Sequence, residues 1–321
     1  MNGLRQRHPS LEFYARRSLR FVLSLLAMVI VSFAMIRVIP GNPVRAQLGI
    51  TATEQEIRIR TRELGLNQSL LSQLWTYLGH LFTGHLGTSI TLQEPVSNII
   101  ATRLPNTLEI ASMAFLVTMV LSISAGLLLG AFTNGGRHPR TELSFTATTG
   151  LLVTIPEFVL AVLLQYVFGV KLGILPIAEK SGWTSYIMPV ASLSIPPAAA
   201  LSRLVRVETL NALGRDYMRT ARSKRLPARL LYLRHVLPNV LTATLTLGGL
   251  LLVGLIAGTV LVETVFAWPG IGSTIVQAIE QKDYPLIQAL VLLLGSMVLF
   301  VNFVVDILLG AIDPRSAIRT T

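Results

Sequence analysis

The stretch LVRVETLNALGRDYMRTARSKRLPARLLYLRHVLP, residues 204–238, is the one polar interruption in the apolar C-terminal half of the chain. It carries the densest cluster of positive charge in the sequence, and it contains no set of residues that could catalyse a reaction by itself. The apolar segments on either side of it are long enough to cross a bilayer. This combination predicts a docking surface between membrane-embedded helices.

The composition is typical of a polytopic membrane protein. The 321 residues are 52% hydrophobic and 13% charged, with a mean hydropathy of +0.62. Such a chain has too few polar side chains to cover a water-soluble globule of this size. The formal charge of +11 would suggest nucleic acid as the partner of a soluble protein. The bias of Lys and Arg toward cytoplasmic loops accounts for it here, so we expect no nucleic-acid partner.

The chain contains no cysteine, which excludes disulfides, thiolate metal sites and a cysteine nucleophile, and leaves either side of the membrane open. The first apolar run, residues 21–36, follows three arginines and resembles a signal peptide. It ends in Arg37 and Pro40, however, without a small-x-small cleavage site. We therefore expect it to remain as a membrane anchor.

Six segments have about the 20 apolar residues that cross a bilayer as a helix. They are residues 19–38, 107–132, 145–169, 185–204, 239–262 and 286–310. The fourth contains Pro189, Pro196 and Pro197, which remove backbone donors and should kink or break the helix. The predicted fold is an all-α membrane protein with six transmembrane helices.

Lys and Arg are distributed unequally between alternate flanks of these segments. One set of flanks holds 18 of the 27, the other holds eight, and Arg37 lies at the end of the first span. Because Lys and Arg accumulate on the cytoplasmic side, we expect both termini to be cytoplasmic. The predicted organisation is a cytoplasmic tail (1–18), a first transmembrane helix (19–38), an extracytoplasmic helical loop (39–106), a five-helix core (107–310) that includes the cytoplasmic loop 205–238, and a cytoplasmic C-terminal tail (311–321).

The extracytoplasmic loop should contain two helices. Thr53-x-x-Glu56 has the pattern of a capping box, with the helix stopping near Gly65. A second helix should start after Asn67, because apolar residues follow at helical spacing. They are Leu70, Leu71, Leu74, Leu78 and Leu81. The loop is either a cap that shields the bundle or a platform for an external partner, and an amphipathic helix fits both.

Familiar catalytic and metal-binding patterns are missing from the sequence. The histidines lie at positions 8, 80, 85, 138 and 235. Only His80 and His85 are near one another, and a spacing of five places them on different sides of a helix. No G-x-x-x-x-G-K-[ST], G-x-S-x-G or H-E-x-x-H occurs. We therefore expect no bound metal, no Walker-type ATP site and no hydrolase site.

Charged residues inside the predicted spans are candidates for a transport pathway, because a charge in hydrocarbon costs on the order of 3 kcal/mol. Glu157 lies near the middle of the third span, directly after Pro156, where a kinked backbone would point it into the bundle or a water-filled passage. It is either a pathway or gating residue, which we favour, or a buried carboxylate with polar partners. Asp306 and Glu263 lie nearer to span ends, where both should reach the headgroups.

Within the polar stretch, residues 216 to about 224 predict a short amphipathic helix. Its side chains fall on two arcs. One arc carries Tyr217, Met218 and Ala221, and the other carries Arg215, Arg219 and Arg222. Pro227 should end this helix, and a second helix from Ala228 should lead into the fifth span. Either the basic residues only set topology, or the helix inserts into a groove on a cytoplasmic partner.

This stretch resembles the cytoplasmic signature loop of ABC importer permeases, E-A-A-x-x-x-G-x9-I-x-L-P, in the variant of the dipeptide, oligopeptide and nickel permease family. In register, Arg219-Thr220-Ala221 take the E-A-A positions, Arg225 the glycine position, His235 the isoleucine position and Leu237-Pro238 the closing L-P. Other segments that resemble the family are IPGNP (39–43), GHLGTS (84–89), RLPNTLE (103–109), VFAWPGIG (265–272), KDYPLIQ (282–288) and VNFVVDILLGAIDPR (301–315). At Arg225 the chain departs from the pattern, which has glycine at this position. A non-glycine residue in a left-handed cap costs on the order of 1 kcal/mol. Either the turn has another geometry or the following proline absorbs the strain.

The resemblance implies a permease subunit with the type I ABC importer fold in a prokaryotic inner or cytoplasmic membrane. Such a subunit pairs with a second, similar permease and with two cytoplasmic ABC ATPases that bind ATP and magnesium, and an extracytoplasmic binding protein delivers peptide. The resemblance assigns ATPase coupling to Asp216, Tyr217, Met218, Arg219, Thr220, Ala221, Arg222, Lys224, Arg225 and Pro238.

Other functions remain to be separated from import of di- or oligopeptides. The same machinery could carry nickel or another small solute. An ion-coupled secondary carrier would need coupling-ion residues of its own and often shows internal repeats, whereas Glu157 is the only plausible ion residue and no clear repeat is present. An integral-membrane enzyme would need a catalytic constellation that the sequence does not contain.

Overall fold

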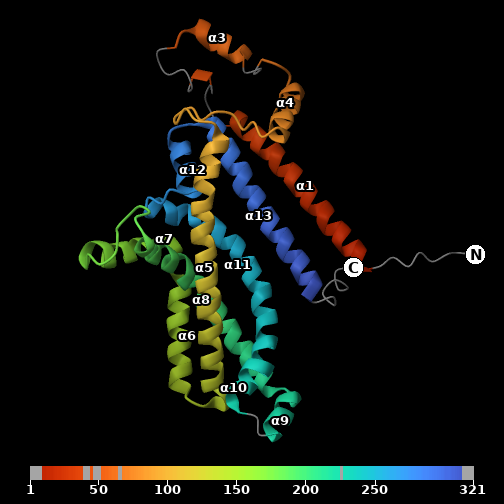
Figure 1. Ribbon diagram of the computed structural model, residues 1–321, viewed down its shortest axis with the longest axis vertical. Helices are drawn as coiled ribbons and strands as arrows, with labels where there is room; N and C mark the ends of the chain where they lie inside the picture. The colour runs from red at the N-terminus through yellow and green to blue at the C-terminus, as the bar shows by residue number, and fades with distance from the viewer. Residues whose placement is uncertain (1–8, 39–43, 46–51, 64–66, 225–226, 313–321) are drawn as a thin grey trace, which may run out of the picture.

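The computed structural model describes residues 9–38, 44–45, 52–63, 67–224 and 227–312. Within these residues the protein is helical (Figure 1), and its β-structure is limited to an isolated bridge between Thr88 and Pro95. The all-α fold predicted from the sequence is confirmed. The longer helices are α1 (Pro9–Val38), α3 (Glu54–Glu63), α4 (Leu70–Phe82), α5 (Val96–Phe132), α6 (Pro139–Thr154), α7 (Glu157–Leu164), α8 (Ile187–Gly214), α9 (Asp216–Ser223), α11 (Leu237–Val265), α12 (Ile271–Glu280) and α13 (Tyr284–Ile312).

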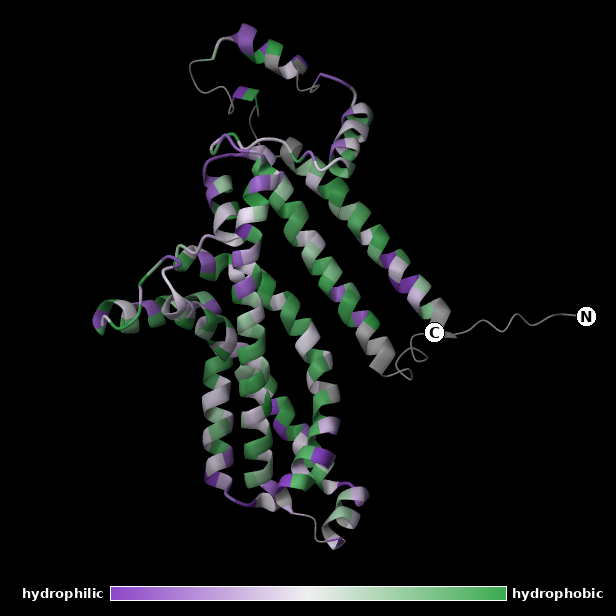
Figure 2. Cartoon of the chain, in the orientation of Figure 1, coloured by the Kyte–Doolittle hydropathy of each residue, from purple (hydrophilic) through white to green (hydrophobic). Residues whose placement is uncertain are grey.

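Five stretches of helix are long and apolar enough to cross a membrane. They are Phe13–Met35, Val96–Phe132, Trp183–Gly214, Thr244–Val265 and Tyr284–Ile307. The pair formed by Pro139–Thr154 and Glu157–Lys171 passes the same test as one span that bends by 96°. Counting that pair as one broken span gives the predicted six. Apolar residues run along most of the length of these helices, whereas hydrophilic ones are found mostly near helix ends and in the loops (Figure 2).

The helices α5 and α8 form the central pair, and glycines let them approach closely. A Cβ atom added at Gly126 would lie 2.4 Å from Cβ of Val205, and one added at Gly130 would lie 2.7 Å from Cβ of Thr209. Because the two glycines are four residues apart, both lie on the face of α5 that meets α8. Small residues in this spacing are a common device of membrane helix packing.

The prolines of the fourth span were expected to kink or break its helix, and a break is absent, because α8 runs as one α-helix through Pro196 and Pro197. Its packing explains the difference. Its span is 61% buried within the chain, against 28% or less for the other four unbroken spans. The Thr118 hydroxyl of α5 donates a hydrogen bond to the carbonyl of Ser194 at 3.4 Å, next to the two prolines. Neighbouring helices thus surround α8 where its own ladder of hydrogen bonds is interrupted.

The third span is broken where the sequence places Pro156. Ile155 has an extended conformation, α6 ends at Thr154, and α7 starts at Glu157 and runs sideways (Figure 1). A π-helical segment, Gln165–Lys171, continues α7. Because proline disfavours helical geometry in the residue before it, the break has a local cause.

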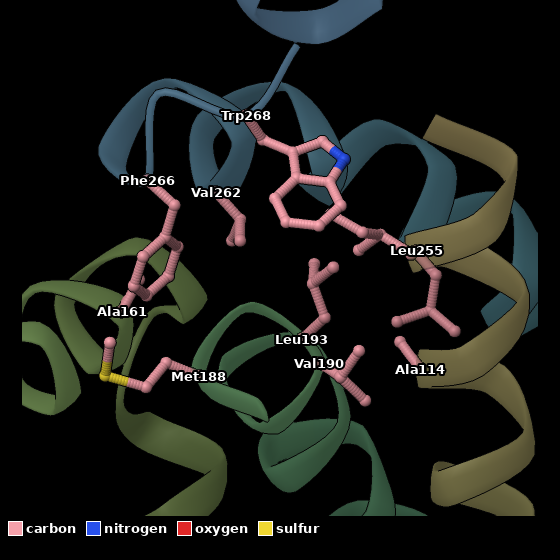
Figure 3. Packing of buried hydrophobic residues seen from close by; sticks show 10 residues of the cluster. Ala114, Ala161, Met188, Val190, Leu193, Leu255, Val262, Phe266 and Trp268 are labelled. Atoms are coloured by element: carbon pink, nitrogen blue, oxygen red, sulfur yellow. The ribbon is translucent and has the colours of Figure 1, made fainter. Parts of the chain in front are cut away.

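A cluster of buried apolar side chains fills the junction of α5, α7, α8 and α11 with the turn after α11 (Figure 3). Leu193 lies at its centre, and Trp268 closes it from the side of that turn. The members that Figure 3 labels are Ala114, Ala161, Met188, Val190, Leu193, Leu255, Val262, Phe266 and Trp268.

The first and last spans, α1 and α13, pack along each other beside this central group (Figure 1). Arg17 of α1 forms an ion pair with Asp306 of α13 at 2.6 Å, and Phe21 stacks on Phe303 with ring centroids 4.7 Å apart. Asp306 lies near the end of the last span and is about one-third exposed, so its reach to the headgroups stays a prediction. Its pair with Arg17 ties the first and last spans together.

The two helices predicted between the first and second spans are present. The capping box is confirmed: the amide and hydroxyl of Thr53 donate to Oε2 of Glu56 at 2.8 and 2.9 Å, and the Glu56 amide donates to the Thr53 hydroxyl at 3.3 Å. Ser69 caps α4 by accepting a hydrogen bond from the amide of Ser72. Both helices lie at the end of the molecule opposite α9 (Figure 1).

Candidate functional site

At one end of the bundle, α9 projects from the end of α8 and forms the helix expected within the polar stretch (Figure 1). Its apolar side packs against its own chain. Met218 is fully buried and Ala221 almost so, in a cluster with Leu213, Leu231 and Val236. The predicted arc of Tyr217, Met218 and Ala221 is therefore divided, because Met218 and Ala221 face inward and Tyr217 is 40% exposed. The inward side fixes α9 to the bundle, and the outward side is available to a partner.

The outward side of α9 is polar. Asp216, Thr220 and Lys224 are exposed beside Tyr217. Arg225 lies outside the described residues, as do the side chains of Arg219 and Arg222, so the turn at the glycine position of the signature stays a prediction.

A short connection joins this helix to the fifth span. α10 (Ala228–Leu231) and a π-helical turn (Tyr232–Val236) lead without a break into α11, and Pro238 is the second residue of α11, directly after the π-helical turn. Leu231, Val236 and Val240 share the buried cluster of Met218, so α9 packs against both the connection and the start of α11.

Glu157, the residue predicted for the pathway, lies at the bend between α6 and α7. Its carboxylate rests on α11 at Gly258, where an added Cβ would lie 2.2 Å from Oε2 and 3.3 Å from the side chain of Leu193. The side chain is partly exposed. Among the side chains that the structure describes, no ion pair joins Glu157 to a cation. The bend therefore holds a carboxylate at the junction of three membrane helices.

At the opposite end of the bundle, Lys180 is the centre of a polar cluster that the sequence did not predict. Its Nζ donates to Oε2 of Glu109 at 2.6 Å and to Oδ1 of Asn106 at 2.9 Å, and the hydroxyl of Tyr186 donates to the same Glu109 oxygen at 2.8 Å. The ammonium also lies 5.6 Å from the ring centre of Tyr186 and 5.8 Å from that of Trp268. The hydrogen bond to Glu109 raises the pKa of Lys180 above its ordinary value.

This cluster joins two segments that are far apart in sequence. The side-chain amide of Asn106 donates a hydrogen bond to the backbone carbonyl of Pro269 at 2.7 Å, and the indole of Trp268 donates one to the backbone carbonyl of Asn106 at 3.3 Å. The hydroxyl of Thr107 accepts a hydrogen bond from the backbone amide of Ile271 at 2.8 Å. RLPNTLE (103–109) and VFAWPGIG (265–272) therefore form one structural unit at the top of α5 and α11.

Glu263 is buried inside the same unit, where the expectation that it reaches the headgroups is wrong. Its side chain has no exposed surface, and Oε2 accepts the amide of Ser273 at 3.1 Å. A Cβ added at Gly270 would lie 2.3 Å from this carboxylate, and one at Gly272 would lie 2.9 Å from it. The two glycines thus leave the space in which Glu263 accepts a hydrogen bond at the start of α12, which folds back over the end of α11.

A second buried carboxylate, Asp283, connects the segment before α5 to the last span. Its Oδ2 accepts the hydroxyl of Ser89 at 2.5 Å and the amide of Thr91 at 3.1 Å, while Oδ1 accepts the amide of Leu286 at 3.3 Å. Asp283 therefore caps α13 and holds the loop around Ser89 at the same time. GHLGTS (84–89) and KDYPLIQ (282–288) meet at this residue.

The described residues contain no group of three or more His, Asp or Glu side chains that could hold a metal ion. His80 and His85 are both exposed, and Nδ1 of His85 lies 2.9 Å from the Thr83 hydroxyl.

Periodicity and charge counts could not single out Glu109, Lys180, Asp283 or the buried position of Glu263. The signal was the set of short motifs that resemble the permease family, since Glu109, Glu263 and Asp283 lie in or beside those motifs. Lys180 lies in no such motif, and only the fold brings it to Glu109.

Comparisons with known proteins agree with these motifs. Residues 122–318 match the model of the binding-protein-dependent transport system inner membrane component, and residues 10–111 match the N-terminal part of such membrane components. The chain is 34% identical over 304 residues to the glutathione transport system permease protein GsiC of Salmonella choleraesuis and 35% identical over 305 residues to that of Escherichia coli K12. Each alignment covers 95% of this chain and 98% of the relative.

The fold is also similar to a solved structure. A chain of the MetNI methionine ABC transporter, in an inward-facing conformation, superimposes with a TM-score of 0.53 over 67% of this chain and 96% of that chain, at 17% sequence identity.

Proposed function

Because the chain belongs to the family of binding-protein-dependent transport system inner membrane components, we propose that it forms, with a second permease, the pathway by which an ABC importer moves di- or oligopeptides. Membership makes it a multi-pass inner membrane permease subunit, which binds no cofactor and has no ATPase activity. ATP is bound and hydrolysed by partner ATPase subunits.

The relatives support a peptide as the substrate. Those that align over 95% of the chain are named as glutathione permeases, and glutathione is a peptide. The motifs that resemble the dipeptide, oligopeptide and nickel permease family make structural contacts, namely Asn106 with Pro269 and Ser89 with Asp283, and they support the family rather than one of its substrates.

The observation that carries the proposal is the position of α9. It lies in the segment that resembles the coupling loop, its inward side is held by Met218 and Ala221, and its outward side is polar. We propose that this outward side, with Asp216, Tyr217, Thr220 and Lys224, docks on a cytoplasmic ATPase subunit. The residues Arg219, Arg222, Arg225 and Pro238 of the same loop belong to this proposal. Both termini are then cytoplasmic, and the end that carries Lys180 faces outward.

In this proposal, closure of the ATPase dimer pushes α9 sideways and the connection Ala228–Val236 passes the movement to α11. ATP and the loaded binding protein must both favour the outward-open state, since a ligand shifts a conformational equilibrium only by its difference in affinity for the two states.

Cysteine cross-linking tests the docking surface, because the natural chain has no cysteine. Thr220→Cys should form a disulfide with a cysteine on the ATPase groove in the assembled importer. The matched control is Ala221→Cys, the next residue of the same helix, which points into the chain. Equal cross-linking of the two variants, or none from Thr220→Cys in an intact complex, would contradict the proposal.

Uptake measurements separate an ATP-driven importer from an ion-coupled carrier. Uptake of labelled peptide should stop when the partner ATPase is inactivated, and it should continue in the presence of an uncoupler while ATP is maintained. The reverse pattern would refute ATP-driven import.

A deletion strain tests the substrate class. It should lose growth on defined di- or tripeptides as the source of a required amino acid and regain it with the gene restored. Normal peptide growth combined with lost nickel uptake would instead identify the metal as the substrate of the same machinery.

Glu157 is the residue that we propose for the pathway. Its partly exposed carboxylate lies at the α6–α7 bend against α11, which is the span connected to α9. Glu157→Gln keeps the shape of the side chain and should reduce uptake more than it reduces assembly. If both are unchanged, the carboxylate has only a structural part.

A further inference from the structure

The helix α4 presents an apolar surface that nothing in the described chain covers. Leu71 and Trp75 are each 70% exposed and Phe82 is 90% exposed. With 3.6 residues per turn, these three side chains and Leu78 lie within an arc of about 60°. We call these four residues the α4 strip. A polar arc with Ser72, Thr76 and His80 lies about 90°, 130° and 170° from the centre of the strip, so the helix is amphipathic.

The contacts of α4 fix its depth relative to the membrane. The hydroxyls of Tyr77 and Ser32 are 3.2 Å apart, and the ring of Tyr77 lies 5.8 Å from that of Phe33. Both partners belong to α1, whose apolar span ends at Met35. At a rise of 1.5 Å per residue, Ser32 lies about 5 Å inside the outer end of that span. The middle of α4 is thus held at the boundary between hydrocarbon and headgroups, beside the end of α1 (Figure 1).

Near this contact, α1 also carries exposed apolar side chains. Ile30 and Val31, one turn or less before Phe33, are both exposed apolar residues of the membrane span. Trp and Tyr at this depth are typical of membrane interfaces, where an apolar ring borders water. An amphipathic helix with a large aromatic and a leucine-rich side is the usual form of an element that lies on a bilayer.

We infer that the α4 strip inserts into the outer leaflet, so that the occupant of this surface is lipid and the extracytoplasmic loop is anchored to the membrane beside the first span. The loop between the first two spans then has a fixed height above the bilayer. This inference depends on the depth of Tyr77 and holds whatever solute the importer carries.

Spin labelling tests it in the complete importer, reconstituted into lipid vesicles with the cysteines of the other subunits replaced. Nitroxides are attached at Leu71→Cys and Trp75→Cys, and at Ser72→Cys and Thr76→Cys as matched controls one residue further along the same helix. Labels on the strip should collide readily with oxygen, which concentrates in lipid, and poorly with a water-soluble nickel chelate. The control labels should show the reverse ratio.

Two other outcomes would overturn the inference. Strip labels hidden from both reagents would mean that a protein, either the second permease or the binding protein, covers the strip. Strip labels open to the nickel chelate would place the strip in water.

A second measurement keeps the native side chain. Lipids brominated near the glycerol end of the acyl chain should quench part of the tryptophan fluorescence of the unlabelled importer, and this part should disappear in Trp75→Phe. Identical quenching of the two proteins would also refute insertion.

Discussion

The close approach of α5 and α8 gives a sharp prediction for Gly126→Ala. The added methyl would lie 2.4 Å from Cβ and Cγ1 of Val205 and 2.7 Å from the carbonyl oxygen of Ser202. Carbon atoms pack at 3.5–4.0 Å, so the helices would have to separate locally by about 1 Å. Part of the obstacle is backbone, which a change of rotamer cannot relieve.

Two energies of opposite sign decide the result. Alanine is favoured over glycine inside a helix by up to about 1 kcal/mol. Overpacking of a tight contact costs about 1–3 kcal/mol. Gly150 of α6 provides a control that separates the two, because a Cβ there meets nothing within 4 Å. The stability of Gly150→Ala should therefore reflect only the helix preference for alanine. The difference in free energy of unfolding between the two variants should equal the cost of overpacking, about 1–3 kcal/mol.

The measurement is the free energy of unfolding of each variant, from denaturing-detergent titrations in mixed micelles. Gly126→Ala should be less stable than Gly150→Ala by that difference. Adding Val205→Ala should restore only part of it, since the contacts with Cβ of Val205 and the Ser202 carbonyl remain. If Gly126→Ala were as stable as Gly150→Ala, the deduction that glycine sets the distance between these helices would be wrong.

The polar contacts at the opposite end of the bundle give three further predictions. Asp283→Ala leaves one hydroxyl and two backbone amides without their acceptor and should lower the free energy of unfolding by about 3 kcal/mol or more. Ser89→Ala should lower it by about 1 kcal/mol. Equal losses would contradict the double role of the carboxylate. Lys180→Met should cost no more than about 1 kcal/mol, because the pair with Glu109 is partly exposed and solvent screens it; a larger loss in the same titration would mean that the cation–ring contacts dominate. Two hydrogen bonds from Thr53 lower the pKa of Glu56, and the one from the backbone amide has a larger effect than the one from the hydroxyl. The stabilisation is therefore present above the ordinary pKa and lost as pH falls through the lowered one, so hydrogen exchange in α3 should accelerate in acid, and Glu56→Gln should abolish this pH dependence.

Much of the architecture follows from local patterns in the sequence. The length of apolar runs located the spans, and the Thr53-x-x-Glu56 pattern located the start of α3, because both effects act within a few neighbouring residues. Pro156 marked the bend of the third span for the same reason. The short helix from Asp216 followed from the periodicity of its side chains.

Predictions that depended on neighbours across the bundle were less successful. Pro196 and Pro197 do not break α8, whose span is largely buried by surrounding helices. Met218 and Ala221 were grouped with Tyr217, since periodicity gives the arc of a helix but not the side that its own chain covers. Glu263 is buried by a segment that folds back over it, and neither hydropathy nor spacing of the residues near it indicates that burial.

The double contact of Asp283 also limits the order in which the protein can be assembled during synthesis. Its partner Ser89 is made 194 residues earlier. At 5–20 residues per second, the loop around Ser89 exists for roughly 10 to 40 s before its acceptor leaves the ribosome. During that interval four predicted spans enter the membrane while Ser89 and Thr91 lack the carboxylate that accepts their hydrogen bonds. The last span therefore completes the first loop, and a chain truncated before residue 283 should expose that loop to proteases even if every earlier span is inserted.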